Sequence, residues 1–324
     1  LIINDSSEQG REIIYTQTRD EKLEVWNGKR LGVEGVMLEL GFQIAENNRN
    51  FDIEFIENYK GGVFHIPSEE DIRDTKDEGD LYDLLRVFNN ELDNKKVKSD
   101  DKQLEKWTSQ LRQDKQAKEL KLLKQAIDIT CEAHNENMRL MKPGAEYETE
   151  AIVEYIFKKN GAEYTGFPSI IGSGENSCIL HYTSSRKMAL ENELIVCDIG
   201  AEYHGYTADI TRTLPVNGKY TENQKTSYNL VLKAQQAGID SCKAGKSFWS
   251  AHIAATTIIS QGLKELGIIK SPLEVRKYFI HGTSHYLGLD VHDAGLYKDL
   301  APNQVITVEP GIYIPEGSDC DPKW

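Results

Sequence analysis

"LIVCDIGAEYHGYTADITRTL", residues 194–214, places two apolar runs on either side of the turn-forming sequence YHGY. This pattern predicts a β-hairpin. Asp198 and Asp209 stand on its two arms. A turn centred on Tyr203–His204 would place them directly opposite each other, and a turn centred on His204–Gly205 would place them one diagonal apart. Because side chains alternate between the two faces of a strand, both registers put the two carboxylates on the same face.

This pair of carboxylates needs an explanation, because like charges that face each other on a sheet lower its stability. A pair of metal ions would hold them together, and so would an arginine side chain. A third reading is a hairpin whose acidic face lies in water, since aspartate is mostly exposed in folded proteins. The spacing alone leaves all three open.

Two later segments add further candidate ligands. HGTSHYLGLDVHD, residues 281–293, holds three of the eight histidines of the chain but fits neither the zinc-finger pattern nor H-E-x-x-H. NQVITVEPGIYIP, residues 303–315, reads as a strand with Glu309 inside an apolar run. Burying this glutamate would be costly unless it is paired or binds metal, and the alternative is that it faces water.

The combination of Asp198, Asp209, one histidine and Glu309 is more specific than any of its parts. Carboxylate oxygens with one imidazole suit manganese or a similar divalent ion better than a structural zinc site. Two carboxylates that can bridge indicate a two-metal site. Such a pair of ions lowers the pKa of a bridging water, so that hydroxide is available near neutral pH.

The composition of the chain limits the classes of function. With 324 residues, 39% of them hydrophobic, two domains are expected, with a boundary near residue 106. A net charge of −14 repels phosphate backbones, so nucleic acid is not expected as a partner. Five cysteines without a C-x-x-C pair indicate a reducing, cytoplasmic compartment. No apolar run is long enough to span a membrane.

The pattern of apolar residues predicts an α+β fold, with a mostly antiparallel sheet and helices on one side. One long helix is expected from about Lys102 to Met141, where Pro143 and Gly144 would end it. Thr221 with Gln224 predicts the start of another helix through a capping box. Further expected helices are 151–161, 250–267 and a short one opened by Ser271, Pro272 and Glu274, and β-like runs are 11–17, 35–40 and 51–56.

Several of these segments resemble the successive motifs of the pita-bread metallopeptidases, the creatinase and aminopeptidase fold. They are DIGAEYHGYTADITRT, HGTSHYLGLDVHD and VEPGIY, and GSGENSCILHYT with TRTLPVNGKYTENQ are similar to bacterial-type aminopeptidase P. That family removes an N-terminal residue that is followed by proline. The resemblance covers roughly 108–324, so it implies a pita-bread catalytic domain over 106–324, and residues 1–105 are compatible with a smaller α/β N-terminal domain. Both domains are expected to be truncated at the ends of the chain.

The resemblance also assigns roles to particular residues. It implies that two divalent ions, most naturally Mn²⁺ with Co²⁺ or Zn²⁺ as alternatives, are bound by four ligands: Asp198, Asp209, His285 and Glu309. Glu309 would also pass on a proton, and His181, His281 and His292 would line the substrate side without binding metal. The family has a fifth ligand, a glutamate in a following R-x-E-D strand. The chain stops at Trp324 without it, so a genuine end there would leave the second metal weakly held.

The expected activity is that of a metal-dependent exopeptidase, a Xaa-Pro aminopeptidase, acting on peptides with proline in second position. Two alternatives remain. A prolidase shares the fold and ligands but cleaves only dipeptides, and a pita-bread relative that has lost its ligands would be a non-catalytic binding module. We also expect a homo-oligomer, either a dimer or a tetramer.

Overall fold

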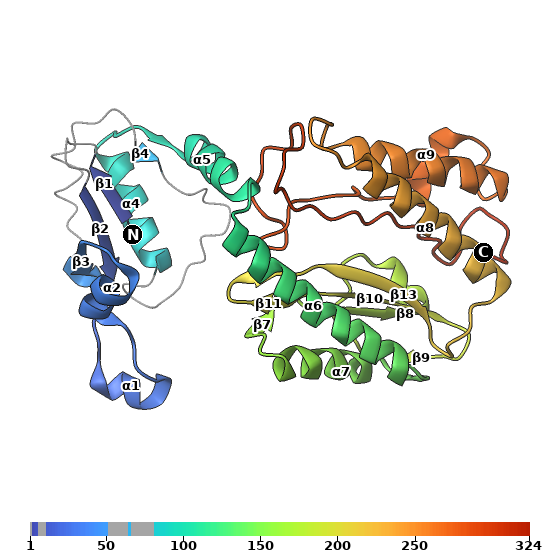
Figure 1. Ribbon diagram of the computed structural model, residues 1–324, viewed down its shortest axis with the longest axis horizontal. Coiled ribbons are helices and arrows are strands. Elements are labelled where there is room, and N and C mark those ends of the chain that lie inside the picture. The colour runs from blue at the N-terminus through green and yellow to red at the C-terminus, as the bar shows by residue number, and fades with distance from the viewer. Residues whose placement is uncertain (1, 6–10, 51–63, 66–80) are drawn as a thin grey trace. The chain divides into compact units, whose positions relative to one another are not determined.

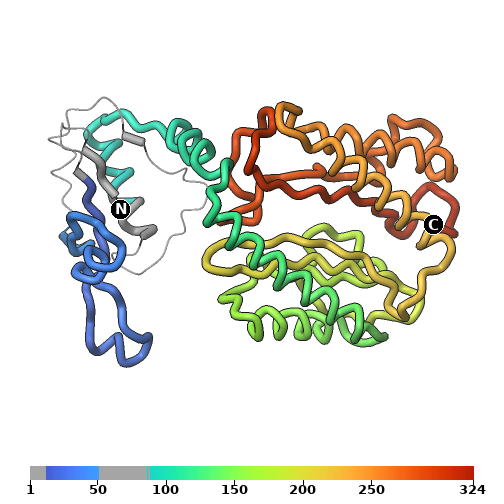
Figure 2. The backbone as a smooth tube through the Cα atoms, viewed as in Figure 1, coloured from blue at the N-terminus to red at the C-terminus, as the bar shows by residue number. Residues whose placement is uncertain are grey.

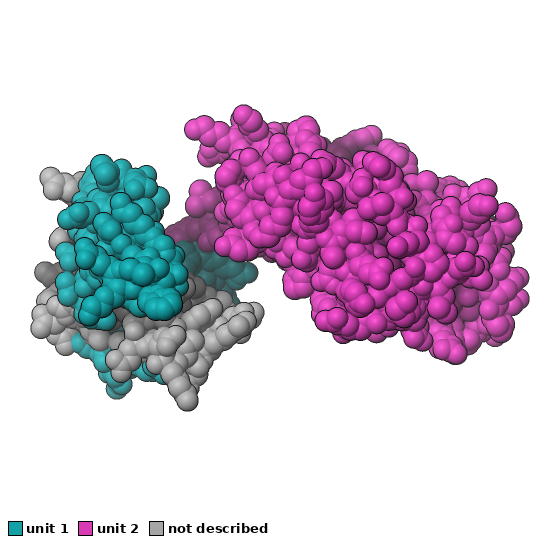
Figure 3. Space-filling model, turned by 90° about the horizontal axis from the view of Figure 1, so that it is seen from below, with its two compact units in different colours: residues 1–105 teal, residues 106–324 magenta. Residues whose placement is uncertain are grey.

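The structure is a computed structural model that describes residues 2–5, 11–50, 64–65 and 81–324. The chain divides into two compact units, residues 1–105 and residues 106–324 (Figure 3). The predicted β-like run at 51–56 lies outside the described residues. No helix among the described residues is long and apolar enough to cross a membrane.

The first unit contains a three-stranded sheet in the order β1-β2-β3, in which β1 is antiparallel and β3 parallel to β2. Its elements are β1 (Ile2–Asp5), β2 (Arg11–Thr16), α1 (Glu21–Asn27), α2 (Gly32–Leu40), β3 (Ile44–Asn47), η1 (Asn48–Asn50), β4 (Phe64–His65), α4 (Leu81–Asn94) and β5 (Ser99–Asp100). The prediction of a β-like run at 35–40 is wrong, because these residues belong to α2. The parallel pair β2–β3 needs a crossover connection, which α1 and α2 provide.

In the second unit, α6 (Ala117–Leu140) and α7 (Glu146–Lys159) cover one face of an antiparallel sheet (Figure 1). The sheet order is β13-β10-β8, and a smaller sheet has the order β12-β11-β7. Helix α5 (Asp101–Gln113) spans the boundary between the two units. The strands of the second unit are β6 (Gly144–Ala145), β7 (Tyr164–Thr165), β8 (Ile170–Ser173), β9 (Met188–Ala189), β10 (Leu194–Ile199), β11 (Ala201–Tyr203), β12 (Tyr206–Thr207) and β13 (Ile210–Pro215). The 3-10 helix η2 (Gly174–Cys178) follows β8.

The core of this half lies between the sheet and helices α6 and α7. Ile129 of α6 and Phe157 of α7 pack in one buried cluster with the inward-facing residues of β10, which are Ile195, Cys197 and Ile199. Side chains of a strand alternate between its faces. The remaining residues of β10, Asp198 among them, therefore face the other side of the sheet, away from α6 and α7.

The predicted helix over 102–141 is in fact two helices. Residues 114–116 separate α5 from α6, and Gln116 opens α6 through a capping box in which its backbone N–H donates to Glu119 Oε2 at 2.7 Å. The predicted capping boxes at Thr221 and Ser271 are confirmed, because they open α8 (Glu222–Ser241) and η3 (Pro272–Lys277). The expected helix at 250–267 is α9 (Ser250–Glu265).

Helices α8 and α9 pack against each other and cover the last part of the chain, an extended segment drawn in red (Figure 2). Two stretches of this part run alongside each other. Leu287 N–H donates to Val305 O at 3.1 Å, Thr307 N–H to His285 O at 3.0 Å, and Glu309 N–H to Thr283 O at 2.9 Å.

The sequence predicts a strand over 303–315, but the described structure has an extended segment there with one isolated bridge at Ile306. One reason is that the backbone N–H of His285 donates to the side-chain hydroxyl of Thr307, at 3.1 Å, rather than to a backbone carbonyl. This bond interrupts the regular ladder between the two stretches.

Candidate metal centre

The hairpin at 194–214 takes the second of its two predicted registers. Tyr203 pairs with Tyr206, so the turn is His204–Gly205, and Asp198 pairs with Thr211. Both turn residues have positive φ, 49° at His204 and 83° at Gly205, as a two-residue type I′ hairpin turn requires. Asp209 therefore lies one diagonal from Asp198, on the face of the sheet opposite to α6 and α7.

His285 and Glu309 reach this face from the two extended stretches of the C-terminal part. His285 Nε2 lies 3.2 Å from Asp209 Oδ2 and 3.0 Å from Glu309 Oε1. One ligand atom from each of Asp209, His285 and Glu309 lies within 4.8 Å of the other two. The fold thus brings together three of the predicted ligands from three separate segments of the chain.

Asp198 lies one diagonal from Asp209 on the same face of the sheet, and its burial and the charges around it change its pKa. Burial, the charge of Asp209 and, more weakly, that of Glu309 raise the pKa of Asp198 to about 7, although a hydrogen bond with Thr211 opposes the shift. Asp198 Oδ1 is buried without a hydrogen-bond partner among the described residues. A buried carboxylate oxygen without a partner is costly and fits a position for a cation.

The orientation of His285 is fixed by its neighbours. Its Nδ1 is 2.9 Å from the carbonyl oxygen of Tyr286, so Nδ1 carries the proton and donates, and Nε2 points at the carboxylates. A histidine that binds metal is usually held in this way, with its other ring nitrogen donating to a carbonyl. Thr307 supports the same arrangement, because its hydroxyl donates to Glu309 Oε1 at 2.7 Å.

The charges of the cluster indicate a site that favours a cation. Burial lowers the pKa of His285, but hydrogen bonds with Asp209 and Glu309 outweigh it and raise this pKa to about 10. Burial raises the pKa of Glu309, but hydrogen bonds from His285 and Thr307 lower it further than burial raises it. A divalent ion bound here would displace the proton of His285 Nε2 and take its place as the positive charge beside the carboxylates. Three carboxylates and one imidazole form a donor set that fits a divalent ion such as manganese.

The other predicted histidines surround this cluster. The ring of His292 lies 4.4 Å, between centroids, from the ring of His285. Burial, and then the charge of His285, lower the pKa of His292, and a weaker effect in the same direction comes from His181, which therefore lies within electrostatic range. His281 Nε2 is 2.9 Å from the hydroxyl of Tyr313.

Two residues of the site, Thr307 and Tyr313, were not among those predicted from the sequence. Both lie two or four positions from Glu309, on the stretch that was expected to be a regular strand. Side chains alternate between the two faces of a strand, so residues two and four positions from Glu309 share its face. This spacing could have identified Thr307 and Tyr313 as neighbours of the site.

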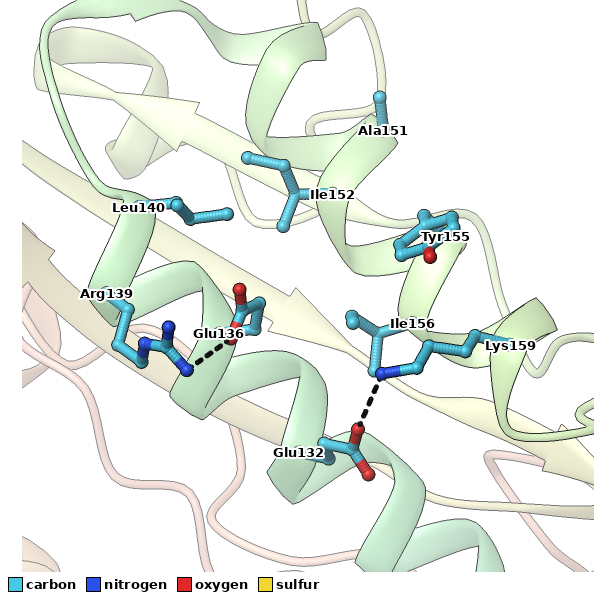
Figure 4. Close-up of a pocket in the computed structure, with 9 residues that line it drawn as sticks. All are labelled: Glu132, Glu136, Arg139, Leu140, Ala151, Ile152, Tyr155, Ile156 and Lys159. Atoms are coloured by element: carbon cyan, nitrogen blue, oxygen red, sulfur yellow. Dashed lines mark ion pairs between the residues drawn. The ribbon is translucent and has the colours of Figure 1, made fainter.

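A separate hollow of about 570 Å³ lies between α6 and α7 (Figure 4). Ion pairs cross it or flank it, with Glu132 3.7 Å from Lys159 and Glu136 3.1 Å from Arg139. None of the predicted site residues lines it. This hollow is therefore not part of the candidate metal centre.

Comparison with known proteins gives consistent results along the chain. Residues 121–321 match metallopeptidase family M24. The Xaa-Pro aminopeptidase of Haemophilus influenzae is 34% identical, with 100% of this chain and 76% of the relative covered. The Xaa-Pro aminopeptidase of Escherichia coli is 33% identical with the same coverage. The human Xaa-Pro dipeptidase is 33% identical over 60% of this chain and 46% of the relative.

Solved structures show the same likeness. Proline aminopeptidase P II from Yersinia pestis matches with a TM-score of 0.85 and 30% identity, over 99% of this chain and 77% of that one. A zinc-substituted aminopeptidase P from Escherichia coli in complex with product matches with a TM-score of 0.83 and 30% identity, over 98% of this chain and 76% of that one.

Proposed function

The chain belongs to metallopeptidase family M24, and on this basis we propose that it is a metal-dependent aminopeptidase that hydrolyses the bond between an N-terminal residue and a following proline. The resemblance to the pita-bread metallopeptidases and the α+β fold are both confirmed. The observation that carries the proposal is the cluster of Asp209, His285 and Glu309 beside the buried carboxylate of Asp198. We further propose that residues 106–324 form the catalytic domain and residues 1–105 a smaller N-terminal domain.

The four side chains Asp198, Asp209, His285 and Glu309 would hold two divalent ions, with Mn²⁺ preferred and Co²⁺ or Zn²⁺ as alternatives. One of the solved relatives is a zinc-substituted aminopeptidase P, which supports the view that such sites accept more than one ion. When bound, such ions supply a water whose pKa is low enough to provide hydroxide near neutral pH.

The surrounding residues would do the rest of the chemistry. Glu309 would accept a proton and pass it to the leaving amine, and the hydroxyl of Thr307 donates a hydrogen bond to one of its oxygens. Burial lowers the pKa of His292 and so favours its neutral ring, which carries an N–H that would donate to the oxyanion formed from the scissile carbonyl. His181 and His281 would position the peptide and its proline ring.

Two rival functions are less well supported. A prolidase is the nearest, but the human Xaa-Pro dipeptidase covers a smaller share of the chain than the bacterial aminopeptidases do. A non-catalytic binding module would not be expected to retain four candidate ligands at one place, three of them within 4.8 Å of one another.

The proposed setting of the enzyme follows from the sequence. Its substrates are peptides with proline in second position, and a net charge of −14 argues against nucleic acid as a partner. We propose that it acts in the cytoplasm as a homo-oligomer, a dimer or a tetramer.

The test is hydrolysis of a matched set of peptides by the purified protein with Mn²⁺, followed by mass spectrometry. A Xaa-Pro-Xaa tripeptide should lose its first residue, and a Xaa-Ala-Xaa tripeptide should be left intact. Hydrolysis of the Xaa-Pro dipeptide alone would replace the proposal with a prolidase. No hydrolysis of any peptide, with Mn²⁺, Co²⁺ or Zn²⁺, would leave only the binding module.

A further inference from the structure

Glu146 is a fully buried carboxylate in the first turn of α7, with 0% of its surface exposed. A buried carboxylate is costly unless hydrogen bonds satisfy it. Five donors do so here: Oε1 accepts from Ser173 N–H at 2.7 Å, Ser173 Oγ–H at 2.8 Å and Asn176 Nδ2 at 3.1 Å, and Oε2 accepts from Tyr182 Oη–H at 2.8 Å and Lys187 N–H at 3.0 Å.

All five donors belong to one segment, residues 173–187, which leads from the end of β8 through η2 to β9. The bonds hold the start of the segment at Ser173, its middle at Tyr182 and its end at Lys187. The backbone N–H of Glu146 also donates to the carbonyl of Lys187 at 3.0 Å. Residues 179–187 have no regular secondary structure in the described chain. The hydrogen bonds of one carboxylate therefore hold a loop that has no backbone hydrogen-bond ladder within itself.

This loop carries His181, directly before Tyr182, whose hydroxyl is bonded to Glu146. The function proposed above gives His181 the task of positioning the peptide substrate. A shift of the loop would therefore move a side chain that the substrate needs, although Glu146 itself does not belong to the cluster.

We propose that Glu146 is a positioning residue that fixes the segment 173–187 and thereby holds His181 in place against the peptide substrate. The proposal rests on the function proposed above. A carboxylate is required because its five partners all donate. A glutamine would turn an NH₂ group toward either the backbone N–H of Ser173 or that of Lys187, and a backbone N–H cannot accept a hydrogen bond.

The experiment is a double-mutant cycle on the Mn²⁺-loaded protein, with kcat/KM for the Xaa-Pro-Xaa tripeptide as readout. Glu146→Gln should lower kcat/KM by about 10²-fold, as expected for a misplaced substrate-binding group. In a His181→Ala background the same substitution should have little further effect, because the group that it positions is already absent. Independent, multiplicative losses in the two backgrounds would overturn the proposal.

Two other variants sharpen the test. Glu148→Gln removes the same charge from the same first turn of α7 at an exposed position, so its kcat/KM should equal that of the wild type. Tyr182→Phe removes a single donor next to His181 and should give a smaller loss that is also absent in the His181→Ala background. This variant decides the question if Glu146→Gln fails to fold, and a loss that persists in that background would overturn the proposal.

Hydrogen exchange separates the failure of this proposal from the failure of the proposed function. In the metal-free protein, amides of residues 173–187 should exchange faster in Glu146→Gln than in the wild type, while amides of α8 and α9 should be unchanged. If the wild type cleaves no Xaa-Pro peptide, the proposed function fails and the exchange data still show whether Glu146 fixes the loop. Unchanged exchange in the loop would overturn the positioning role by itself.

Discussion

Replacing Lys115 by methionine is expected to destabilise the protein by about 3 kcal/mol. Lys115 Nζ lies 2.7 Å from Asp293 Oδ2, and each side chain is 1% exposed. Removing one partner of a buried ion pair costs about 3–5 kcal/mol, because the other charge stays buried without compensation. We expect the lower end of this range because the guanidinium of Arg112, which is 24% exposed, also contacts Asp293.

The measurement is urea unfolding of the variant and the wild type, followed by circular dichroism. The variant should lose about 3 kcal/mol of unfolding free energy in urea, and on heating its Tm should fall by about 6–12 °C for a unit of this size. Lys118→Met is the matched control, because Lys118 is exposed on the same stretch of chain and its loss should change the stability by less than about 0.5 kcal/mol. Equal stabilities for the two variants would refute the reasoning.

A second substitution tests the cause of the loss. Asp293→Asn combined with Lys115→Met removes both charges, so no uncompensated charge is left in the interior. The double variant should be more stable than the sum of the two single losses predicts, by about 0.5–3 kcal/mol. Strict additivity would mean that the two residues do not act as a pair.

Two further outcomes are expected. Burial lowers the pKa of His134 to about 4 in the folded protein, whereas its ordinary value is 6.5. The folded state therefore loses about 3 kcal/mol of stability from this residue as the pH falls from 6.5 toward 4, because only the unfolded chain can take up the proton. In urea unfolding over this pH range, His134→Gln should show a smaller loss of stability than the wild type. His292→Ala should retain bound metal by elemental analysis but lose about 10²-fold in kcat, and metal loss in this variant would show that His292 is a ligand.

The hairpin and the helices could be predicted because their signals are local. The apolar runs around YHGY specify a two-residue turn, and the positive φ of Gly205 selects one of the two registers. Capping residues such as Thr221 satisfy backbone groups within the same turn of helix, so the start of α8 follows from a few residues. Residues 35–40 were misread because a short apolar run has no period that separates a strand from a helix.

The arrangement of the site depends on contacts between distant segments. Three histidines lie within 281–293, and their spacing could not select His285, because the choice is made by the Tyr286 carbonyl and by two carboxylates from other segments. The resemblance to a known family selected it instead. The irregular stretch at Glu309 was missed for the same reason, since the hydroxyl of Thr307 takes the place of a backbone carbonyl only once the chain has folded.

The break between α5 and α6 also could not be predicted from the local sequence. The apolar pattern continues from one helix to the next, and no proline or glycine lies between them. The break at 114–116 places Lys115 in the interior against Asp293, a residue far along the chain. A contact of this kind overrides local helix propensity and leaves no mark in the local sequence.

The most direct test of the metal centre is calorimetric titration of Mn²⁺ into the wild type and Asp209→Asn, with hydrolysis of a Xaa-Pro-Xaa tripeptide measured on the same samples. Asp209→Asn keeps the size of the side chain, so the variant should fold, but it should lose both tight Mn²⁺ binding and hydrolysis. Asp128→Asn, at an exposed position on α6, should keep both. Wild-type binding and turnover in Asp209→Asn would contradict the assignment of the cluster as the metal site.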